Sequence, residues 1–312
     1  MNSTVKGNLM MTVSKTFSGL NQNALRYLLP HWMNAQSGVV LRLGVGSILF
    51  FIYSIFTRKK FARPGLKDGL MLVAAGLVFV FGYMWTQLKG LTYTTPISSS
   101  IFMSLQPICV FIICLILRTE HATMKKIVGM VVGLGGALVC ILTQHGSDVA
   151  TDPLKGNLFC LAGTVLFSSY LVLEKRFIPR YGSAMVSFLT FGGGAIGAII
   201  SVCFTGWDAL VLQQNIFSTP MLVLLFILIF PTFISYLLQD FSLDLLPATV
   251  VSLYANLILI VSAVMSYILG QDKFSWWQIL AISLMILSVF LVESSENTPS
   301  PAPTSSPQNK IL

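Results

Sequence analysis

Apolar and polar positions come in long blocks along this chain. About ten apolar stretches, each roughly twenty residues long, are separated by short polar connections, and about twenty residues of α-helix cross the hydrocarbon core of a bilayer. The pattern therefore predicts ten transmembrane helices. Their expected ranges are 7–29, 34–56, 67–88, 95–117, 125–144, 155–175, 183–205, 220–241, 247–270 and 275–292.

The two halves of the chain begin alike. The Lys-Gly-Asn-Leu of residues 6–9 recurs 149 residues later at 155–158, and Pro30 recurs as Pro179. Because this repeated motif stands at the start of two similar hydropathy patterns, it predicts an internal duplication. An odd number of spans between the copies inverts the second copy, as in many secondary transporters.

We therefore expect an all-α integral membrane protein made of two inverted five-helix repeats. The first repeat is expected at residues 1–149 and the second at 150–293. Residues 294–312 are rich in Ser, Pro and Thr and are expected to form a disordered cytoplasmic tail.

Composition excludes a water-soluble domain. Only 10% of the residues are charged and 55% are hydrophobic, whereas a soluble domain carries about 25% charged residues. The net charge of +8 lies in short loops, which argues against nucleic acid as a partner. All five cysteines fall inside apolar stretches without a metal-binding spacing, so we expect no metal and no cofactor.

Loop charge predicts the orientation. Lys and Arg concentrate in the second, fourth and sixth loops, which places these loops and both termini in the cytoplasm; we expect a bacterial inner membrane. Four tryptophans fall at the opposite ends of the spans, where indole prefers the interface. The loop cations are Arg58, Lys59, Lys60, Arg63, Lys67, Arg118, Lys125, Lys126, Lys175, Arg176 and Arg180, and the tryptophans are Trp32, Trp207, Trp276 and Trp277.

The first span is unusually polar. Ser14, Ser18, Asn21 and Gln22 share one helical face, which must turn toward other helices or a watery cavity because unpartnered polar groups are costly in lipid. Lys15, about eight residues into the span, has two interpretations. It contacts an anionic group of a substrate, or it extends to the cytoplasmic headgroups.

Arg42 lies at a similar depth in the second span. Burying a guanidinium costs a few kcal/mol on insertion scales, so we expect it to pair with a carboxylate or with backbone carbonyls. A structural role is the favoured interpretation, and substrate contact is the alternative.

Four further polar side chains lie at equivalent places in the two halves. Tyr83 and Gln87 in the third span correspond to Ser235 and Gln239 in the eighth at an offset of 152. Each pair is spaced four residues apart and so shares a helical face. We predict that all four line a cavity.

Proline and glycine indicate where the helices bend. Pro107 follows Gln106 in the middle of the fourth span, where it should kink the helix and turn the Gln106 amide toward a cavity. Pro231 and Asn256 are comparable features of the second half. Gly193 is a candidate hinge, although close helix packing is the favoured interpretation of this glycine.

Carboxylates are scarce. Glu174 and Asp240 map to span ends or loops, which weakens the case for a proton relay at membrane depth. His31, His121 and His145 map to loops as well, and no HExxH or GxSxG motif is present. The chain is therefore not expected to be an enzyme.

Several ordered motifs resemble the drug/metabolite transporter superfamily, specifically its EamA-type ten-helix members. Residues 17–21 (Phe-Ser-Gly-Leu-Asn) are similar to the family's aromatic-x-Gly-x-Asn stretch, and residues 88–96 to its Ala-Leu-Lys-Tyr-Thr-Ser-Ala turn. Residues 107–120 are similar to its Pro…Leu-Gly-Glu segment. Arg42 and Gly129, Gly133 and Gly136 also match, whereas Lys15, Thr119 and Asp272 depart from the family pattern.

The resemblance implies a central cavity between the two halves, closed alternately on each side, and substrates that include amino acids, other metabolites and drugs, often exported. The first hypothesis is thus an alternating-access exporter of a small polar metabolite such as an amino acid. The alternative is a carrier of phosphorylated or nucleotide-linked sugars, which needs several cavity cations. A membrane-embedded enzyme or a non-transporting sensor are hypotheses of other classes. The expected partners are the small-molecule substrate and the lipid bilayer; the oligomeric state is open.

Overall fold

A computed structural model describes residues 3–29, 31–57, 63–119, 124–143, 151–272 and 275–296. The sequence predictions for Pro30, the loop cations at 58–60, Glu120, His121, His145 and residues 297–312 of the tail lie outside these ranges. The predicted tail begins at residue 294, but the last helix continues to Glu296.

Every long apolar stretch of the first half is helical. The elements are α1 (Ser3–Leu28), α2 (Ala35–Thr57), α3 (Leu66–Ala75), the π-helix η1 (Gly76–Val80), α4 (Phe81–Tyr93), α5 (Pro96–Met103), α6 (Gln106–Ile116) and α7 (Met124–Thr143).

The second half repeats this order. Its elements are α8 (Pro153–Tyr181), α9 (Ser183–Thr205), the short 3₁₀-helix η2 (Leu210–Gln213), α10 (Thr219–Ile227), the π-helix η3 (Leu228–Ile234), α11 (Ser235–Leu245), α12 (Ala248–Leu253), α13 (Ala255–Ile268) and α14 (Trp276–Glu296).

Seven helical segments in the described part of the chain are long and apolar enough to cross a membrane. The other three long helices, α1, α7 and α14, have 26, 20 and 21 residues. The apolar stretches of α7 and α14 are shorter, at Ile127–Gly136 and Trp276–Ser288, and α1 carries the polar face described above. The protein is thus a multi-pass membrane protein, and ten spans remain a prediction.

Helix irregularities recur at equivalent places in the two halves. The π-helix η1 begins at Gly76 and η3 begins 152 residues later at Leu228, the offset that relates Tyr83 to Ser235. The helical conformation is also interrupted between α5 and α6 and between α12 and α13. Pro107 lies in the first turn of α6, so the break precedes the proline. Such local departures from α-geometry concentrate at functional sites.

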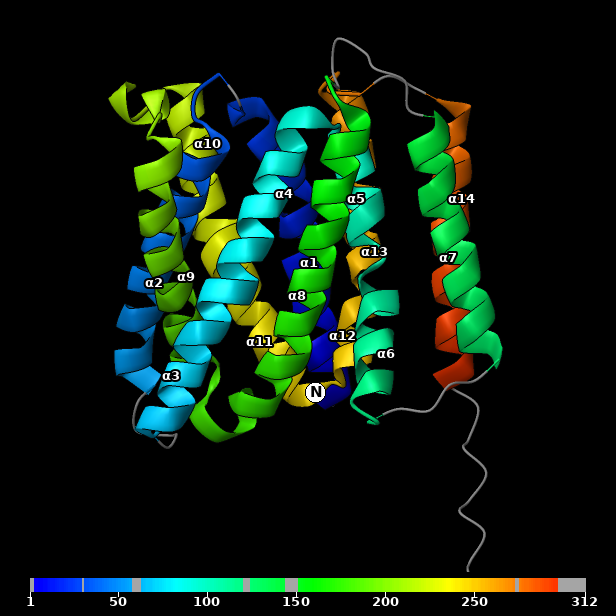
Figure 1. Cartoon of the computed structure of the whole chain (residues 1–312), viewed down its shortest axis with the longest axis horizontal. Coiled ribbons are helices and arrows are strands. Elements are labelled where there is room, and N and C mark those ends of the chain that lie inside the picture. The colour runs from blue at the N-terminus through cyan, green and yellow to red at the C-terminus, as the bar shows by residue number, and fades with distance from the viewer. Residues whose placement is uncertain are drawn as a thin grey trace, which may run out of the picture.

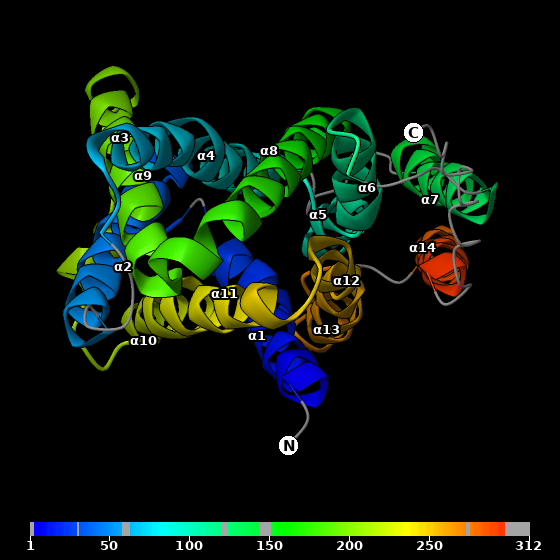
Figure 2. The ribbon, with the colours of Figure 1, turned by 90° about the horizontal axis from the view of Figure 1, so that it is seen from below.

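The halves pack into each other (Figure 1). Helix α1 packs against α11 and α13 of the second half, while α8 packs against α4 and α6 of the first, and α2 packs along α9. Helices α7 and α14 pack on each other at one side of the bundle, as Figure 2 shows. Segments of both halves therefore surround the centre of the molecule.

Two glycines allow a close helix crossing where α3 and η1 meet α9. A Cβ on Gly193 would lie 2.0 Å from the Val73 carbonyl oxygen, and one on Gly76 would lie 1.9 Å from that of Thr190. Helix α9 runs without interruption through Gly193. The structure thus has close packing at this position, and a hinge role for Gly193 remains a prediction.

We expect Gly193→Ala to lower the free energy of unfolding by about 1–3 kcal/mol, because the methyl group forces two backbones apart. Gly44→Ala is the matched control: nothing lies within 4 Å of its added Cβ, and alanine gains about 0.5–1 kcal/mol of helix propensity. Thermal unfolding of both variants in detergent measures the difference. Equal melting temperatures for the two variants would contradict this packing account.

Candidate functional site

A small cavity lies in the middle of the bundle, where α1, α2, α4, α5, α8, η3–α11 and α13 meet. Its volume is about 20 Å³, room for roughly one water molecule. Nine of the residues that the sequence proposed as cavity or hinge positions line it. They are Lys15, Ser18, Asn21, Gln22, Arg42, Tyr83, Pro231, Ser235 and Gln239.

The polar face of α1 is turned toward α11. Ser14 Oγ donates to the Ser235 carbonyl oxygen at 2.7 Å, and Ser235 Oγ donates to the Ser14 carbonyl oxygen at 2.8 Å. Ser18 Oγ lies 3.1 Å from Ser235 Oγ. These reciprocal hydroxyl contacts replace the water that a polar face requires, and they fix the register of α1 on α11.

Lys15 is buried, with 2% of its surface exposed. Its Nζ donates to Gln239 Oε1 at 2.6 Å and lies 5.5 Å from the centre of the Phe167 ring, a cation–π distance. Asp240 attracts it electrostatically. The Lys15 side chain is thus turned into the bundle and does not extend to the headgroups, and its contact with a substrate remains a prediction.

Arg42 is also buried, and its Nε donates to Thr232 Oγ1 at 2.9 Å. Thr232 belongs to the π-helix η3, so the arginine joins α2 to the irregular part of the second half. The cavity therefore has two cations, Lys15 and Arg42. The sequence predicted a carboxylate or backbone carbonyls as the partner of Arg42, whereas the structure has the Thr232 hydroxyl in that role.

Two buried amide atoms at the cavity have no hydrogen-bond partner among the described residues. They are Gln239 Nε2 and Asn21 Oδ1. A buried donor or acceptor that is left without a hydrogen bond costs about 1–3 kcal/mol. Together with Lys15, they offer a cation, a donor and an acceptor to a small polar solute.

The remaining predicted cavity residues lie farther out. Gln87 Nε2 donates to Ser99 Oγ at 2.6 Å, and Ser99 Oγ donates to Gln22 Oε1 at 3.2 Å, so Gln87 is two hydrogen bonds away from the cavity. Gln106 borders a neighbouring void beside Tyr83. Asn256 Nδ2 donates to the Leu253 carbonyl oxygen at 2.7 Å, across the break between α12 and α13.

Two carboxyl groups contradict the sequence-based expectation. Glu174 and Asp240, placed at span ends or loops, are both fully buried inside the bundle. The expectation was wrong because it ended the sixth span at residue 175 and the eighth at residue 241, whereas α8 continues to Tyr181 and α11 to Leu245. Tyr170, one turn before Glu174, was the available sign of an inward-facing position.

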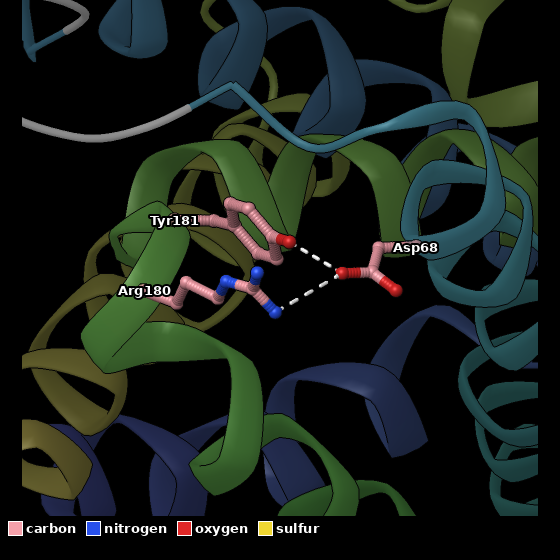
Figure 3. Close-up of polar contacts among 3 residues, drawn as sticks. All are labelled: Asp68, Arg180 and Tyr181. Carbon is pink, nitrogen blue, oxygen red and sulfur yellow. Dashed lines mark hydrogen bonds and ion pairs between the residues drawn. The ribbon is translucent and has the colours of Figure 1, made fainter.

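Polar contacts join the two halves at both ends of the bundle. At the end shown in Figure 3, Tyr181 at the end of α8 donates to Asp68 of α3, and Arg180 Nη1 lies 3.5 Å from the same oxygen, Asp68 Oδ2. At the opposite end, Gln271 Nε2, which follows α13, donates to the Asn23 carbonyl oxygen of α1 at 3.0 Å. The cavity between these contacts is too small for any metabolite, so the structure is a closed conformation.

A larger groove of about 810 Å³ lies between α1, α10 and α13. Apolar side chains form most of its wall, and its polar lining residues include Asn23, Arg26, Thr219 and Gln271. It lacks the converging polar groups of the central cavity, which is therefore the better candidate for recognition of a polar solute.

Comparisons with known proteins agree with this architecture. The sequence model of the EamA-like transporter family matches twice, at residues 5–142 and 154–294. An uncharacterized transporter of Bacillus subtilis, YyaM, is 24% identical over 282 residues, covering 90% of this chain and 91% of its own. An uncharacterized transporter of Archaeoglobus fulgidus is 24% identical and covers 91% of this chain and 97% of its own.

The plant WAT1-related protein At4g01450 of Arabidopsis thaliana is 24% identical over 55% of this chain and 54% of its own. One solved crystal structure superposes with a TM-score of 0.66 at 16% identity, covering 94% of this chain and 96% of the other; at that identity it supports the fold alone.

Fold, cavity and relatives together define a multi-pass membrane transporter. The chain belongs to the EamA-like transporter family, within the drug/metabolite transporter superfamily. The resemblance found in the sequence motifs is thereby confirmed.

Tyr181→Phe should destabilise the closed conformation, because it removes a charge-assisted hydrogen bond worth about 1.5–3 kcal/mol. Arg180→Gln is the matched control: its side chain is 70% exposed, and exposed ion pairs contribute about 0.2–1 kcal/mol. Thermal unfolding in detergent should therefore show the larger decrease for Tyr181→Phe. An equal or larger decrease in melting temperature for Arg180→Gln would show that the Arg180–Asp68 ion pair contributes at least as much as the Tyr181 hydrogen bond.

Proposed function

We propose that this protein exports a small polar metabolite, with an amino acid as the first candidate, by alternating access to the central cavity. The observation that carries the proposal is the buried ammonium group of Lys15 beside two unsatisfied amide atoms at a closed cavity. A carboxylate would bind Lys15, and neighbouring amide groups suit the remaining polar atoms of an amino acid.

Two inverted five-helix halves provide the movement in this proposal. The double match of the family model, the equivalent π-helices and the equivalent helix breaks all support an internal duplication. A cavity of about 20 Å³ must expand before a metabolite enters. Separating the halves at one end while the other end stays joined would give access from one side at a time.

Export follows the expectation for the family, and the loop charges favour cytoplasmic termini in a bacterial inner membrane. Accessibility of epitope tags at the two termini in intact and permeabilised cells tests the orientation. Termini on opposite sides of the membrane would rule out an even number of spans.

Flux through purified protein in proteoliposomes tests the function. Radiolabelled amino acids, sugar phosphates and nucleobases are compared in parallel, and we expect transport of amino acids. Lys15→Gln should weaken apparent affinity for the transported amino acid about 10–100-fold, because it removes a charged hydrogen-bond partner worth about 1.5–3 kcal/mol. Lys155→Gln, an exposed lysine at the start of α8, is the matched control and should retain wild-type flux.

The second candidate is a carrier of phosphorylated or nucleotide-linked sugars. It is favoured by the presence of both Lys15 and Arg42 at one cavity, because a phosphate binds two cations well. Under this hypothesis Lys15→Gln and Arg42→Gln both abolish flux of sugar phosphates, and amino acids are not transported by the wild type.

A further inference from the structure

Two carboxyl groups meet inside the bundle, apart from the cavity wall. Glu174 of α8 and Asp240 of α11 are both fully buried, and their side chains are close enough to interact electrostatically. Neither borders the cavity, so their placement does not favour chemistry on a bound solute.

Hydroxyl donors satisfy one oxygen of each carboxyl group. Tyr170 OH donates to Glu174 Oε1 at 2.5 Å, and Ser187 of α9 donates to Asp240 Oδ2. The other oxygens, Glu174 Oε2 and Asp240 Oδ1, have no hydrogen-bond partner among the described residues. A proton held between the two carboxyl groups would supply a donor for them.

A hydrogen bond between two carboxyl groups requires one proton, because an ionised carboxylate only accepts. Two like charges side by side in a buried place also cannot both remain ionised. The charged and titratable groups that face the pair are Lys15 of α1, Tyr170 of α8 and Tyr236 of α11, with Arg42 and Tyr83 beyond Tyr236. With one shared proton, the pair carries a single negative charge that balances Lys15.

The pair is connected to the cavity through the same two helices. Gln239, which binds Lys15, is the residue before Asp240 on α11, and Phe167 of α8 forms the opposite wall of the cavity. Expanding the cavity for a solute would move α8 away from α11. That movement would separate Glu174 from Asp240 and expose them to water, where each carboxyl group can ionise.

We propose that Glu174 and Asp240 form a proton-binding site that holds one proton in the closed, solute-free conformation and releases it when a solute opens the cavity. The proton and the solute thus occupy alternative states of the carrier. The proton enters from the outside and leaves to the cytoplasm while the solute moves outward, so the transporter is a proton–solute antiporter. The coupling rests on the transport function proposed above, whereas the proton site rests on the carboxyl pair itself.

Infrared spectroscopy of the purified full-length protein tests the site without any solute. We expect the carbonyl stretch of a protonated carboxylic acid at neutral pH in the wild type. Glu174→Gln and Asp240→Asn should each abolish this band, while Asp208→Asn, at an exposed aspartate, should retain it. The side-chain amide that Glu174→Gln introduces can donate to Asp240 as the protonated glutamate does, so this variant should remain folded, as size-exclusion chromatography would check. A wild type without the band, or a band that survives both substitutions, overturns the proposal.

Efflux from proteoliposomes tests the coupling. Vesicles are loaded with a radiolabelled amino-acid mixture, the membrane potential is clamped at zero, and the external medium is acidified. One-for-one exchange predicts that each pH unit sustains about a tenfold solute gradient in the wild type and in Asp208→Asn. Glu174→Gln should lose this dependence on the pH gradient and retain solute–solute exchange.

A Glu174→Gln variant that still responds fully to the pH gradient would contradict the coupling. If no amino acid moves through the wild type, the proposed substrate is wrong, and the infrared band still decides whether the proton site exists. Failure of the function and failure of the site are thus separate outcomes.

Discussion

The burial of one charged helix face governs the rest of this structure. Lys15 lies in the interior, where an unpaired ammonium group costs several kcal/mol even after relaxation. Its contacts with Gln239 and Phe167 offset that cost, and both partners come from the second half of the chain. Helix α1 consequently has to occupy the centre of the bundle and pack on α11. The central cavity forms where this polar face leaves the packing incomplete.

The sequence predicted the parts of the site that depend on helical periodicity. Ser14, Ser18 and Gln22 share a face by spacing alone, and a polar face in lipid has to turn inward. The offset of 152 likewise related Tyr83 to Ser235, and both line the cavity. The prediction of the family followed from the order of the motifs and is confirmed by the match to both halves.

Other features depend on how far a helix continues and could not be read from hydropathy. Glu174 was placed at a span end because Lys175 and Arg176 follow it, yet α8 continues to Tyr181. Hydropathy measures where the apolar stretch ends, and a helix extends beyond that point when its end meets other helices. Gln87 and Asn256 were predicted at the cavity, but local hydrogen bonds to Ser99 and Leu253 hold their amides elsewhere.

The closed state has a simple physical basis. Contacts between the halves at both ends of the bundle hold it shut around a volume that admits roughly one water molecule. Equivalent π-helices, η1 and η3, lie on the two segments that supply cavity walls from opposite halves. Irregular hydrogen bonding in these segments offers places where each half can bend.

Access to the cavity from the two sides of the membrane tests this account most directly. A single cysteine at Ser235, in a background lacking the native cysteines, is treated with a membrane-impermeant maleimide in right-side-out and in inside-out vesicles. The account predicts labelling from both sides, with each reaction suppressed when the Asp68–Tyr181 end or the Asn23–Gln271 end is held closed by cross-linking. Labelling from one side only, or from neither, would contradict a central cavity that opens alternately.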